Sequence, residues 1–153
     1  MSKGIIVQKY GGTSVADVSR IENAAKRVVK TARAGYDVVV IVSAPGDTTD
    51  KLIDMALKIT TNPPDRELDM LLSTGEQVSC ALLAMAAHKL GRDAISFTGA
   101  QVGIITDDSF TKARIIDINA RRIVDELKKG RIVIVAGFQG MNVNQDITTL
   151  GRG

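Results

Sequence analysis

Tryptophan is absent from this sequence, aromatic residues make up only 3% of its 153 residues, and cysteine and histidine occur once each. A single cysteine, Cys80, cannot form an internal disulfide, which favours a reducing, cytoplasmic location. With His88 as the only histidine, the sequence shows no metal-ligand cluster. On one helix, a spacing of two turns keeps Cys80 and His88 apart, which disfavours a cysteine–histidine nucleophile pair. We expect Cys80 to be a small packed residue and His88 to be structural.

Long apolar runs and blocks of one charge are also missing. No apolar run approaches the length of a membrane span, and no separate apolar segment with a cleavage site follows the N-terminus, so we expect neither a membrane location nor a signal peptide. The net charge is +3, and lysines and arginines are interleaved with acids. With few aromatic side chains for base stacking, this pattern argues against a nucleic-acid partner. The small positive excess suits anionic small molecules.

The apolar residues that are present alternate between strand-like and helix-like patterns. The chain is long enough for one domain, and 44% of its residues are apolar. Residues 5–8 are predicted to form a buried strand, and the β-branched run 38–42 is typical of a central parallel strand covered on both faces. Further strands are predicted at residues 94–97 and 131–136. Strands that alternate with helices predict an α/β domain with a mostly parallel sheet and right-handed crossovers.

Helical spacing predicts the segments between these strands. Asp17 or Ser19 caps the first helix, and six of its apolar residues share one buried face: Ile21, Ala24, Ala25, Val28, Val29 and Ala32. Residues 73–76 are predicted to interrupt a later helical segment, so that a long helix starts at that point. Three methionines fall in apolar helical stripes and are expected in the core: Met55, Met70 and Met85.

Four stretches rich in glycine and hydroxyl residues lie directly after predicted strands. They are residues 11–14, 43–49, 98–103 and 137–140. In parallel α/β sheets, ligands gather at the carboxyl ends of the strands. Any one stretch alone is as easily a plain loop. Together, on the same edge of the sheet, they favour a functional rim.

The first of these loops and one acidic residue carry the chemistry that the sequence suggests. Lys9 ends a strand, and Gly11 and Gly12 allow a tight turn and a close backbone approach just before a helix start. This order suits phosphate binding, and an ordinary strand-to-helix turn fits it equally well. Glu76 either stabilises a helix start or accepts a substrate ammonium group. No Gly-x-x-x-x-Gly-Lys-Ser/Thr stretch is present, which disfavours a P-loop kinase.

Several blocks of the sequence, in order, are similar to signature segments of aspartokinases. Residues 9–14, Lys-Tyr-Gly-Gly-Thr-Ser, resemble the opening signature of that family. Residues 42–49 resemble its second strand and loop, and residues 72–76, Leu-Ser-Thr-Gly-Glu, resemble its substrate-binding segment. Residues 135–140 and 148–153 match two further blocks. The resemblance covers essentially the whole chain.

The resemblance implies a fold and a reaction. The fold would be the amino acid kinase (carbamate kinase-like) fold, an α/β three-layer sandwich with a mostly parallel central sheet. The reaction would transfer the γ-phosphoryl group of ATP, with Mg²⁺, to the side-chain carboxylate of L-aspartate by direct in-line attack. The product, 4-phospho-L-aspartate, begins the biosynthesis of lysine, threonine and methionine. No protein ligand for Mg²⁺ is identified in this sequence.

The resemblance also assigns a phosphate end of the site. Lys9 would be the catalytic residue, because it would stabilise the transferring phosphoryl group. The amides of Gly11 and Gly12, with Ser14, would line the ATP phosphates beside Lys9. These assignments follow from the matching motif alone.

At the substrate end, the resemblance assigns residues that would hold L-aspartate. Glu76 would hold its amino group. Arg152, with Thr149, would grip a substrate carboxylate through a bidentate fork. Thr48 or Thr49 would border the pocket, and the match does not distinguish between these two.

The similar proteins continue beyond Gly-Arg-Gly into a second lobe that binds most of the nucleotide, and usually into regulatory domains. We therefore expect residues 1–153 to be the N-terminal, amino-acid-binding lobe, with the nucleotide lobe and regulatory domains absent and little or no activity alone. A homo-oligomer is expected for the full-length protein. Two alternatives stay open: a non-catalytic amino-acid or anion-binding module, and a sibling kinase acting on glutamate or acetylglutamate.

Overall fold

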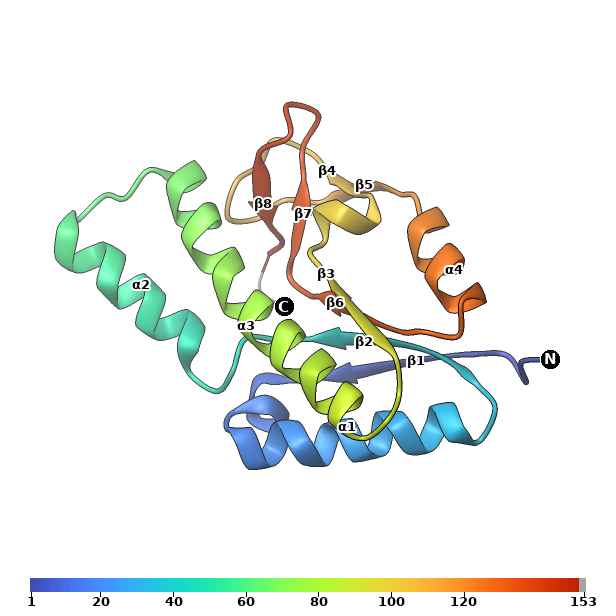
Figure 1. Ribbon diagram of the computed structural model, residues 1–153. Helices are drawn as coiled ribbons and strands as arrows, with labels where there is room; N and C mark the ends of the chain where they lie inside the picture. The colour runs from blue at the N-terminus through green and yellow to red at the C-terminus, as the bar shows by residue number, and fades with distance from the viewer. Residues whose placement is uncertain (152–153) are drawn as a thin grey trace.

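A parallel sheet of four strands, in the order β1-β2-β6-β3, forms the centre of the computed structural model, which describes residues 1–151. Its strands are β1 (Ile5–Tyr10), β2 (Asp37–Val42), β6 (Ile132–Ala136) and β3 (Ala94–Phe97). Helices α1 (Val18–Arg33) and α3 (Asp65–Lys89) cover one face, and α4 (Arg121–Lys128) covers the other (Figure 1). The expected α/β three-layer sandwich is confirmed.

A second, smaller sheet has the strand order β5-β4-β7-β8. Two of its strands precede β6 in the chain, and the other two follow it. Its strands are β4 (Ile104–Thr106), β5 (Ile115–Ile118), β7 (Gln139–Met141) and β8 (Ile147–Thr149). The pairs β4–β5 and β7–β8 are antiparallel, and β4 and β7 run parallel. The sequence showed no signal for β7 and β8, because strands of three residues are too short to display a period of two.

The two strands at the start of the main sheet differ in burial. β2 lies between β1 and β6, and Val38, Val40 and Val42 are almost fully buried, as a central strand requires. The expectation that β1 is buried was wrong. β1 pairs only with β2, and the side chains of Ile5 and Val7 are 59% and 65% exposed. β1 is therefore an edge strand of this chain.

The first helix follows its predicted pattern closely. The carboxylate of Asp17 caps α1 by accepting a hydrogen bond from the backbone N–H of Arg20 at 2.9 Å. The six apolar residues expected on its inner face are all buried. Gly35 follows the helix with a φ of +98°, a backbone conformation that favours glycine.

The expected interruption at residues 73–76 was wrong, because α3 is one continuous helix of 25 residues. The hydroxyls of Ser73 and Thr74 donate to backbone carbonyls of the preceding turn, at 2.8 and 2.7 Å, so they are satisfied within the helix. Gly75 is tolerated because α3 packs closely there against the loop after β2. A Cβ at Gly75 would lie 2.8 Å from the Cβ of Ala44.

Helix α2 (Thr48–Ile59) projects from the body and packs mainly against α3 (Figure 1). None of its residues is fully buried. The expectation that the three methionines lie in the core was wrong: Met55, Met70 and Met85 are 58%, 42% and 64% exposed. Short 3-10 turns occupy Gly12–Val15 and Ala100–Val102.

By length and composition alone, one described helix, α3, could cross a membrane. Of its most apolar 18-residue stretch, 56% is buried inside the protein. Two acidic side chains of α3, Asp69 and Glu76, are also buried there. Since α3 contacts α1, α2 and the main sheet, it is the core helix of this domain.

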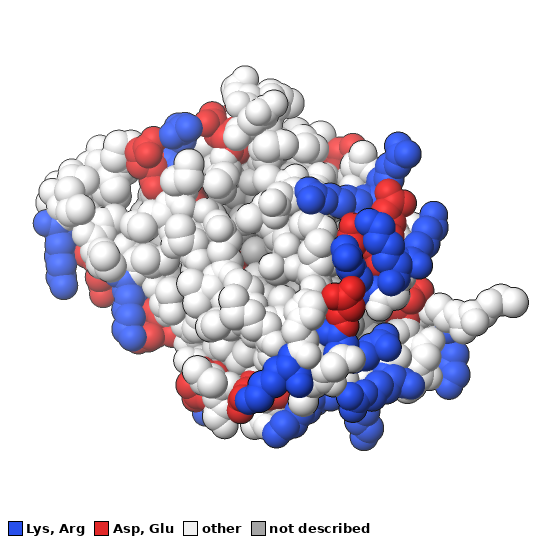
Figure 2. Space-filling view, viewed as in Figure 1, with Lys and Arg blue, Asp and Glu red and all other residues white. Residues whose placement is uncertain are grey.

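Charged side chains are distributed unevenly over the surface. Figure 2 shows Lys and Arg gathered over α4 and α1, with acidic residues among them. Glu126, for example, pairs with both Lys129 and Arg131, at 2.8 and 2.7 Å. The middle of this face is largely uncharged.

Candidate active site

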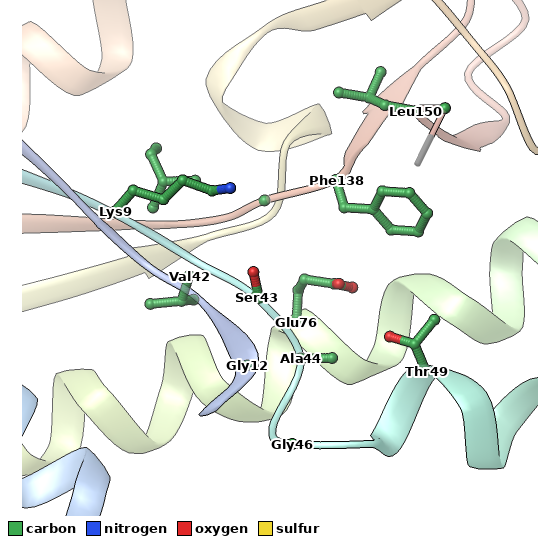
Figure 3. Close-up of a pocket in the computed structure, with 13 residues that line it drawn as sticks. Lys9, Gly12, Val42, Ser43, Ala44, Gly46, Thr49, Glu76, Phe138 and Leu150 are labelled. Atoms are coloured by element: carbon green, nitrogen blue, oxygen red, sulfur yellow. The ribbon is translucent and has the colours of Figure 1, made fainter. Parts of the chain in front are cut away.

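A cavity of about 480 Å³ opens at the carboxyl ends of β1, β2 and β6 (Figure 3). It is lined by Lys9, Gly12, Ile41, Val42, Ser43, Ala44, Gly46, Thr49, Glu76, Gly137, Phe138, Leu150 and Gly151. Three of the four glycine-rich and hydroxyl-rich stretches contribute to this wall. The fourth, residues 98–103, lies outside it and lines other hollows.

Lys9 reaches the cavity from the edge strand. It pairs in register with Ile41 of β2, and both residues line the cavity. Its amino group points into the open space in Figure 3. Within residues 1–151, no carboxylate forms an ion pair with Lys9. The lysine therefore contributes a positive charge that is available to an anionic ligand.

The two glycines of the first turn have different surroundings. A Cβ at Gly12 would lie 3.0 Å from the carbonyl oxygens of Ala44 and Gly46, so glycine lets this turn pack against the loop after β2. The backbone N–H of Gly46 donates to the carbonyl of Gly12 at 2.9 Å. Gly11 does not line the cavity, and its φ of −75° is open to any residue. Gly12 thus joins two loops of the cavity wall.

Ser14 lies away from this cavity. It lines a separate hollow of about 230 Å³ beside α1, together with Tyr10, Arg20 and Arg27. Its backbone N–H donates to the carbonyl of Gly11 at 3.0 Å, which closes the 3-10 turn. The structure therefore does not bring Ser14 to Lys9, and a role in lining phosphates stays a prediction.

Glu76 enters the cavity wall from the middle of α3 and is only 2% exposed. Its predicted place at a helix start was wrong, because α3 begins at Asp65 and runs past it. A contribution to the helix dipole is therefore not its role, since that effect is confined to the first and last turns. A buried carboxylate in the wall of a cavity is suited to accept hydrogen bonds from a cationic group of a ligand.

Of the two threonines that start α2, Thr49 lines the cavity and Thr48 does not. The hydroxyl of Thr48 donates to the carbonyl of Pro45 at 2.5 Å, within its own loop. In Figure 3, Thr49 lies on the same side of the cavity as Glu76. The structure therefore favours Thr49 where the sequence left both residues open.

The aromatic residue Phe138, which the sequence did not single out as a site residue, also lines the cavity. It has a φ of +66°, which is uncommon for a bulky residue and indicates local strain. Its carbonyl accepts the backbone N–H of Leu150 at 2.8 Å, which joins two segments of the wall. Its position directly after β6, within one of the glycine-rich stretches, was the signal that could have identified it.

Thr149 lies behind the wall and is fully buried. Its hydroxyl donates to Asp69 at 2.6 Å, and its backbone N–H donates to the same carboxylate at 2.8 Å. Leu150 and Gly151, the next two residues, line the cavity. Arg152 lies outside the described residues. A grip on substrate by Thr149 and Arg152 stays a prediction.

Cys80 is excluded as a nucleophile by its surroundings. The side chain is 2% exposed, and burial raises the pKa of its thiol to about 12. The thiol lies 3.3 Å from the carbonyl oxygen of Ile134, inside the main core. The reactive thiolate is therefore negligible at neutral pH.

The donor groups of residues 1–151 are too dispersed to form a metal site by themselves. No cluster of three or more His, Cys, Asp or Glu side chains occurs there that could hold a metal ion. Among the described residues, Glu76 is the single carboxylate in the cavity wall. Mg²⁺ bound with a nucleotide usually takes one or two protein carboxylates and the substrate phosphates, and among residues 1–151 Glu76 is the carboxylate that this cavity offers.

Comparison with known proteins relates this chain to a family. The model of the amino acid kinase family matches residues 4–153. An aspartokinase from Bacillus sp. (strain MGA3) is 56% identical over 150 residues. The alignment covers 98% of this chain and 36% of that protein. The chain therefore spans about a third of the length of this curated relative.

Solved structures show the same relationship. The aspartate kinase from Synechocystis is 48% identical, with a TM-score of 0.82, over 97% of this chain and 24% of that one. The E. coli aspartokinase III, in its complex with lysine and aspartate, is 25% identical with a TM-score of 0.83. That match covers 97% of this chain and 44% of the E. coli chain. The resemblance to aspartokinases found in the sequence motifs is thus confirmed.

Proposed function

This chain belongs to the amino acid kinase family, and on that premise we propose that it is the amino-acid-binding lobe of an aspartate kinase. The full protein would transfer the γ-phosphoryl group of ATP to the side-chain carboxylate of L-aspartate. The product would be 4-phospho-L-aspartate, on the route to lysine, threonine and methionine. The aspartokinase from Bacillus, at 56% identity, supports aspartate as the acceptor.

The observation that carries the proposal is the cavity that Lys9 and Glu76 share. A buried carboxylate and a lysine line the same space at the carboxyl ends of parallel strands. L-Aspartate presents an ammonium group and two carboxylates, and ATP presents a chain of phosphates. One acidic and one basic side chain in a single cavity complement that combination.

In this mechanism, each residue of the chain has a limited task. Lys9 neutralises charge on the phosphoryl group as it passes to the acceptor, because phosphoryl transfer is catalysed mainly by positioning and charge stabilisation. Glu76 accepts hydrogen bonds from the substrate ammonium group and so orients the acceptor carboxylate toward Lys9. Thr49 and Phe138 border the acceptor. The carboxylate attacks the phosphorus directly, and no residue of the chain becomes covalently modified.

The remaining assignments belong to the same proposal. Gly11, Gly12 and Ser14 are the residues proposed for the phosphate end, and Arg152 is proposed for the substrate carboxylate. Thr149, which the motif paired with Arg152, donates its hydroxyl to Asp69 behind the cavity wall, so we propose no direct contact between Thr149 and the substrate. Mg²⁺ would arrive with the nucleotide, since residues 1–151 contain no cluster of three or more metal-binding side chains. The full protein is proposed to be a cytoplasmic homo-oligomer whose second lobe binds most of the nucleotide.

The acceptor identifies the reaction. ADP formation by the full-length gene product would be measured with L-aspartate, L-glutamate and N-acetyl-L-glutamate at equal concentration. We expect a kcat/KM for L-aspartate at least about 100-fold above the other two, because a lost or misplaced charged contact costs about 3 kcal/mol. A higher kcat/KM for glutamate or acetylglutamate would show that this compound, and not aspartate, is the substrate. No ADP with any acceptor would refute the kinase assignment.

A further inference from the structure

Asp69 is a fully buried carboxylate that does not line the cavity. It lies in the first part of α3 and accepts hydrogen bonds from two distant segments. Thr149, at the end of β8, donates its hydroxyl at 2.6 Å and its backbone N–H at 2.8 Å. The backbone N–H of Thr111, in the loop between β4 and β5, approaches both carboxylate oxygens, at 3.1 and 3.0 Å.

A carboxylate at this depth must be compensated by donors, because burying an unpaired charge is costly. Within residues 1–151, no lysine, arginine or histidine forms an ion pair with Asp69. Two backbone N–H groups and one hydroxyl serve instead. Thr111 also adopts a φ of +67°, which turns its backbone into this position. Asp69, Thr111 and Thr149 therefore form a buried polar junction inside the protein.

This junction joins two parts of the cavity wall. On one side, Glu76 follows Asp69 by about two turns of the same helix. On the other side, Leu150 and Gly151 follow Thr149 directly and line the cavity. Since α3 is a rigid element, the bonds between Asp69 and Thr149 fix the end of β8 relative to Glu76.

We propose that Asp69 and Thr149 are a positioning pair, which sets the affinity for the amino-acid acceptor without touching it. The pair holds the segment after β8 at the distance from Glu76 that one acceptor molecule requires. Loosening the pair should weaken acceptor binding more than nucleotide binding, because the nucleotide is held mostly elsewhere. The inference rests on the proposed function, since it assumes that the cavity binds an amino acid.

The test is a series of variants in the full-length protein. Thr149→Val removes the hydroxyl and keeps the shape of the side chain, whereas Thr149→Ser retains the hydroxyl. Thr148→Val is the matched control, because Thr148 is equally buried in the same strand and bonds the hydroxyl of Thr106 at 2.6 Å, not Asp69. Asp69→Asn replaces one acceptor oxygen by a donor. For each variant, the calorimetric Kd for L-aspartate and the KM for L-aspartate and for ATP would be measured.

We expect Thr149→Val to raise the Kd and KM for L-aspartate about tenfold, since one hydrogen bond to a charged group is lost. Thr149→Ser and Thr148→Val should stay within about twofold of wild type, and the KM for ATP should change by less than about twofold. Asp69→Asn should weaken L-aspartate binding at least as much as Thr149→Val does. The double variant that combines Asp69→Asn with Thr149→Val should bind L-aspartate no more weakly than Asp69→Asn alone. If Asp69→Asn does not fold, the three threonine variants decide the question.

Equal effects of Thr149→Val and Thr148→Val on aspartate affinity, or a loss confined to kcat, would overturn the positioning pair. A wild-type protein that binds L-aspartate but does not phosphorylate it would refute the proposed function, and the Kd series would still test the pair. A wild-type protein that does not bind L-aspartate would refute both.

Discussion

Lys9 and Glu76 reach one cavity from different layers of the fold, the first from the edge of the sheet and the second from the core helix. Their side chains have different predicted effects on the reaction. In the proposed reaction, Lys9 would act on charge that develops during transfer, whereas Glu76 would act on a substrate ammonium group that is present before and after it. Kinetic constants can therefore separate the two roles.

Replacing Lys9 by methionine in the full-length protein should lower kcat about 100- to 1,000-fold, which is typical for loss of one group that stabilises transition-state charge. The KM for L-aspartate should change only a few-fold, because Lys9 does not hold the acceptor. Lys30→Met is the control, since Lys30 is exposed on α1 and remote from the cavity. A kcat for Lys9→Met within threefold of that for Lys30→Met would remove Lys9 from catalysis.

Glu76→Gln should raise the KM for L-aspartate about 10- to 100-fold, because a charge-assisted hydrogen bond is replaced by a neutral one. Initial rates of ADP formation at varied concentrations of L-aspartate would measure this KM. Glu67→Gln provides the comparison on the same helix, since Glu67 is 61% exposed and forms an ion pair with Arg66 on the surface. An unchanged KM in Glu76→Gln would show that the substrate ammonium group binds elsewhere.

Among the elements of the fold, the close contact between α3 and the loop after β2 shapes the cavity most directly. Gly75 and Ala44 meet there, and Ala44 lines the cavity. In an exposed helix, glycine to alanine stabilises by about 1 kcal/mol. At Gly75 the same substitution should destabilise the protein, because the new Cβ would lie 2.8 Å from the Cβ of Ala44.

We expect Gly75→Ala to lower the free energy of unfolding in urea by about 1–3 kcal/mol, the usual cost of overpacking. Thr74→Ala, at the exposed neighbouring position of the same helix, should change stability by less than about 0.5 kcal/mol. Should Gly75→Ala be as stable as wild type or more so, the contact between α3 and the loop must relax freely. The cavity wall would then be less rigid than described.

Elements with a long, regular pattern were predictable from the sequence. The apolar face of α1, its cap at Asp17 and the central strand β2 are local consequences of residue order. The continuity of α3 was not, because the tolerance of a glycine in its middle depends on Ala44, which is distant in sequence. β1 could not be recognised as an edge strand, since apolar residues alone do not show which neighbours a strand has.

The site was predictable to the same extent. Loops after parallel strands had to meet at one edge, which brought Lys9 and Thr49 to one cavity. Glu76 reaches the same cavity from the middle of α3, which that rule does not predict. The direction of each side chain follows from packing that no motif contains. Ser14 therefore lies in another hollow, and Thr149 faces Asp69, a residue that no pattern had marked.

The whole molecule is a three-layer α/β unit whose candidate active site is the cavity at the carboxyl ends of β1, β2 and β6, and the chain spans about a third of the Bacillus aspartokinase. The exposed apolar side chains of the edge strand, Ile5 and Val7, lie on the sheet face that α4 covers only in part. We propose that this unit provides the acceptor side of an active site whose nucleotide side lies in a second lobe. Kinase activity should then require both this unit and the second lobe.

The most direct test of this account is ADP formation in the presence of L-aspartate, measured for the full-length gene product and for residues 1–153 at equal concentration. We expect aspartate-dependent ADP from the full-length protein and a rate at least about 1,000-fold lower from residues 1–153, because the nucleotide would lack most of its contacts. An inactive full-length protein would contradict the kinase assignment. Full activity of residues 1–153 would contradict the need for a second lobe.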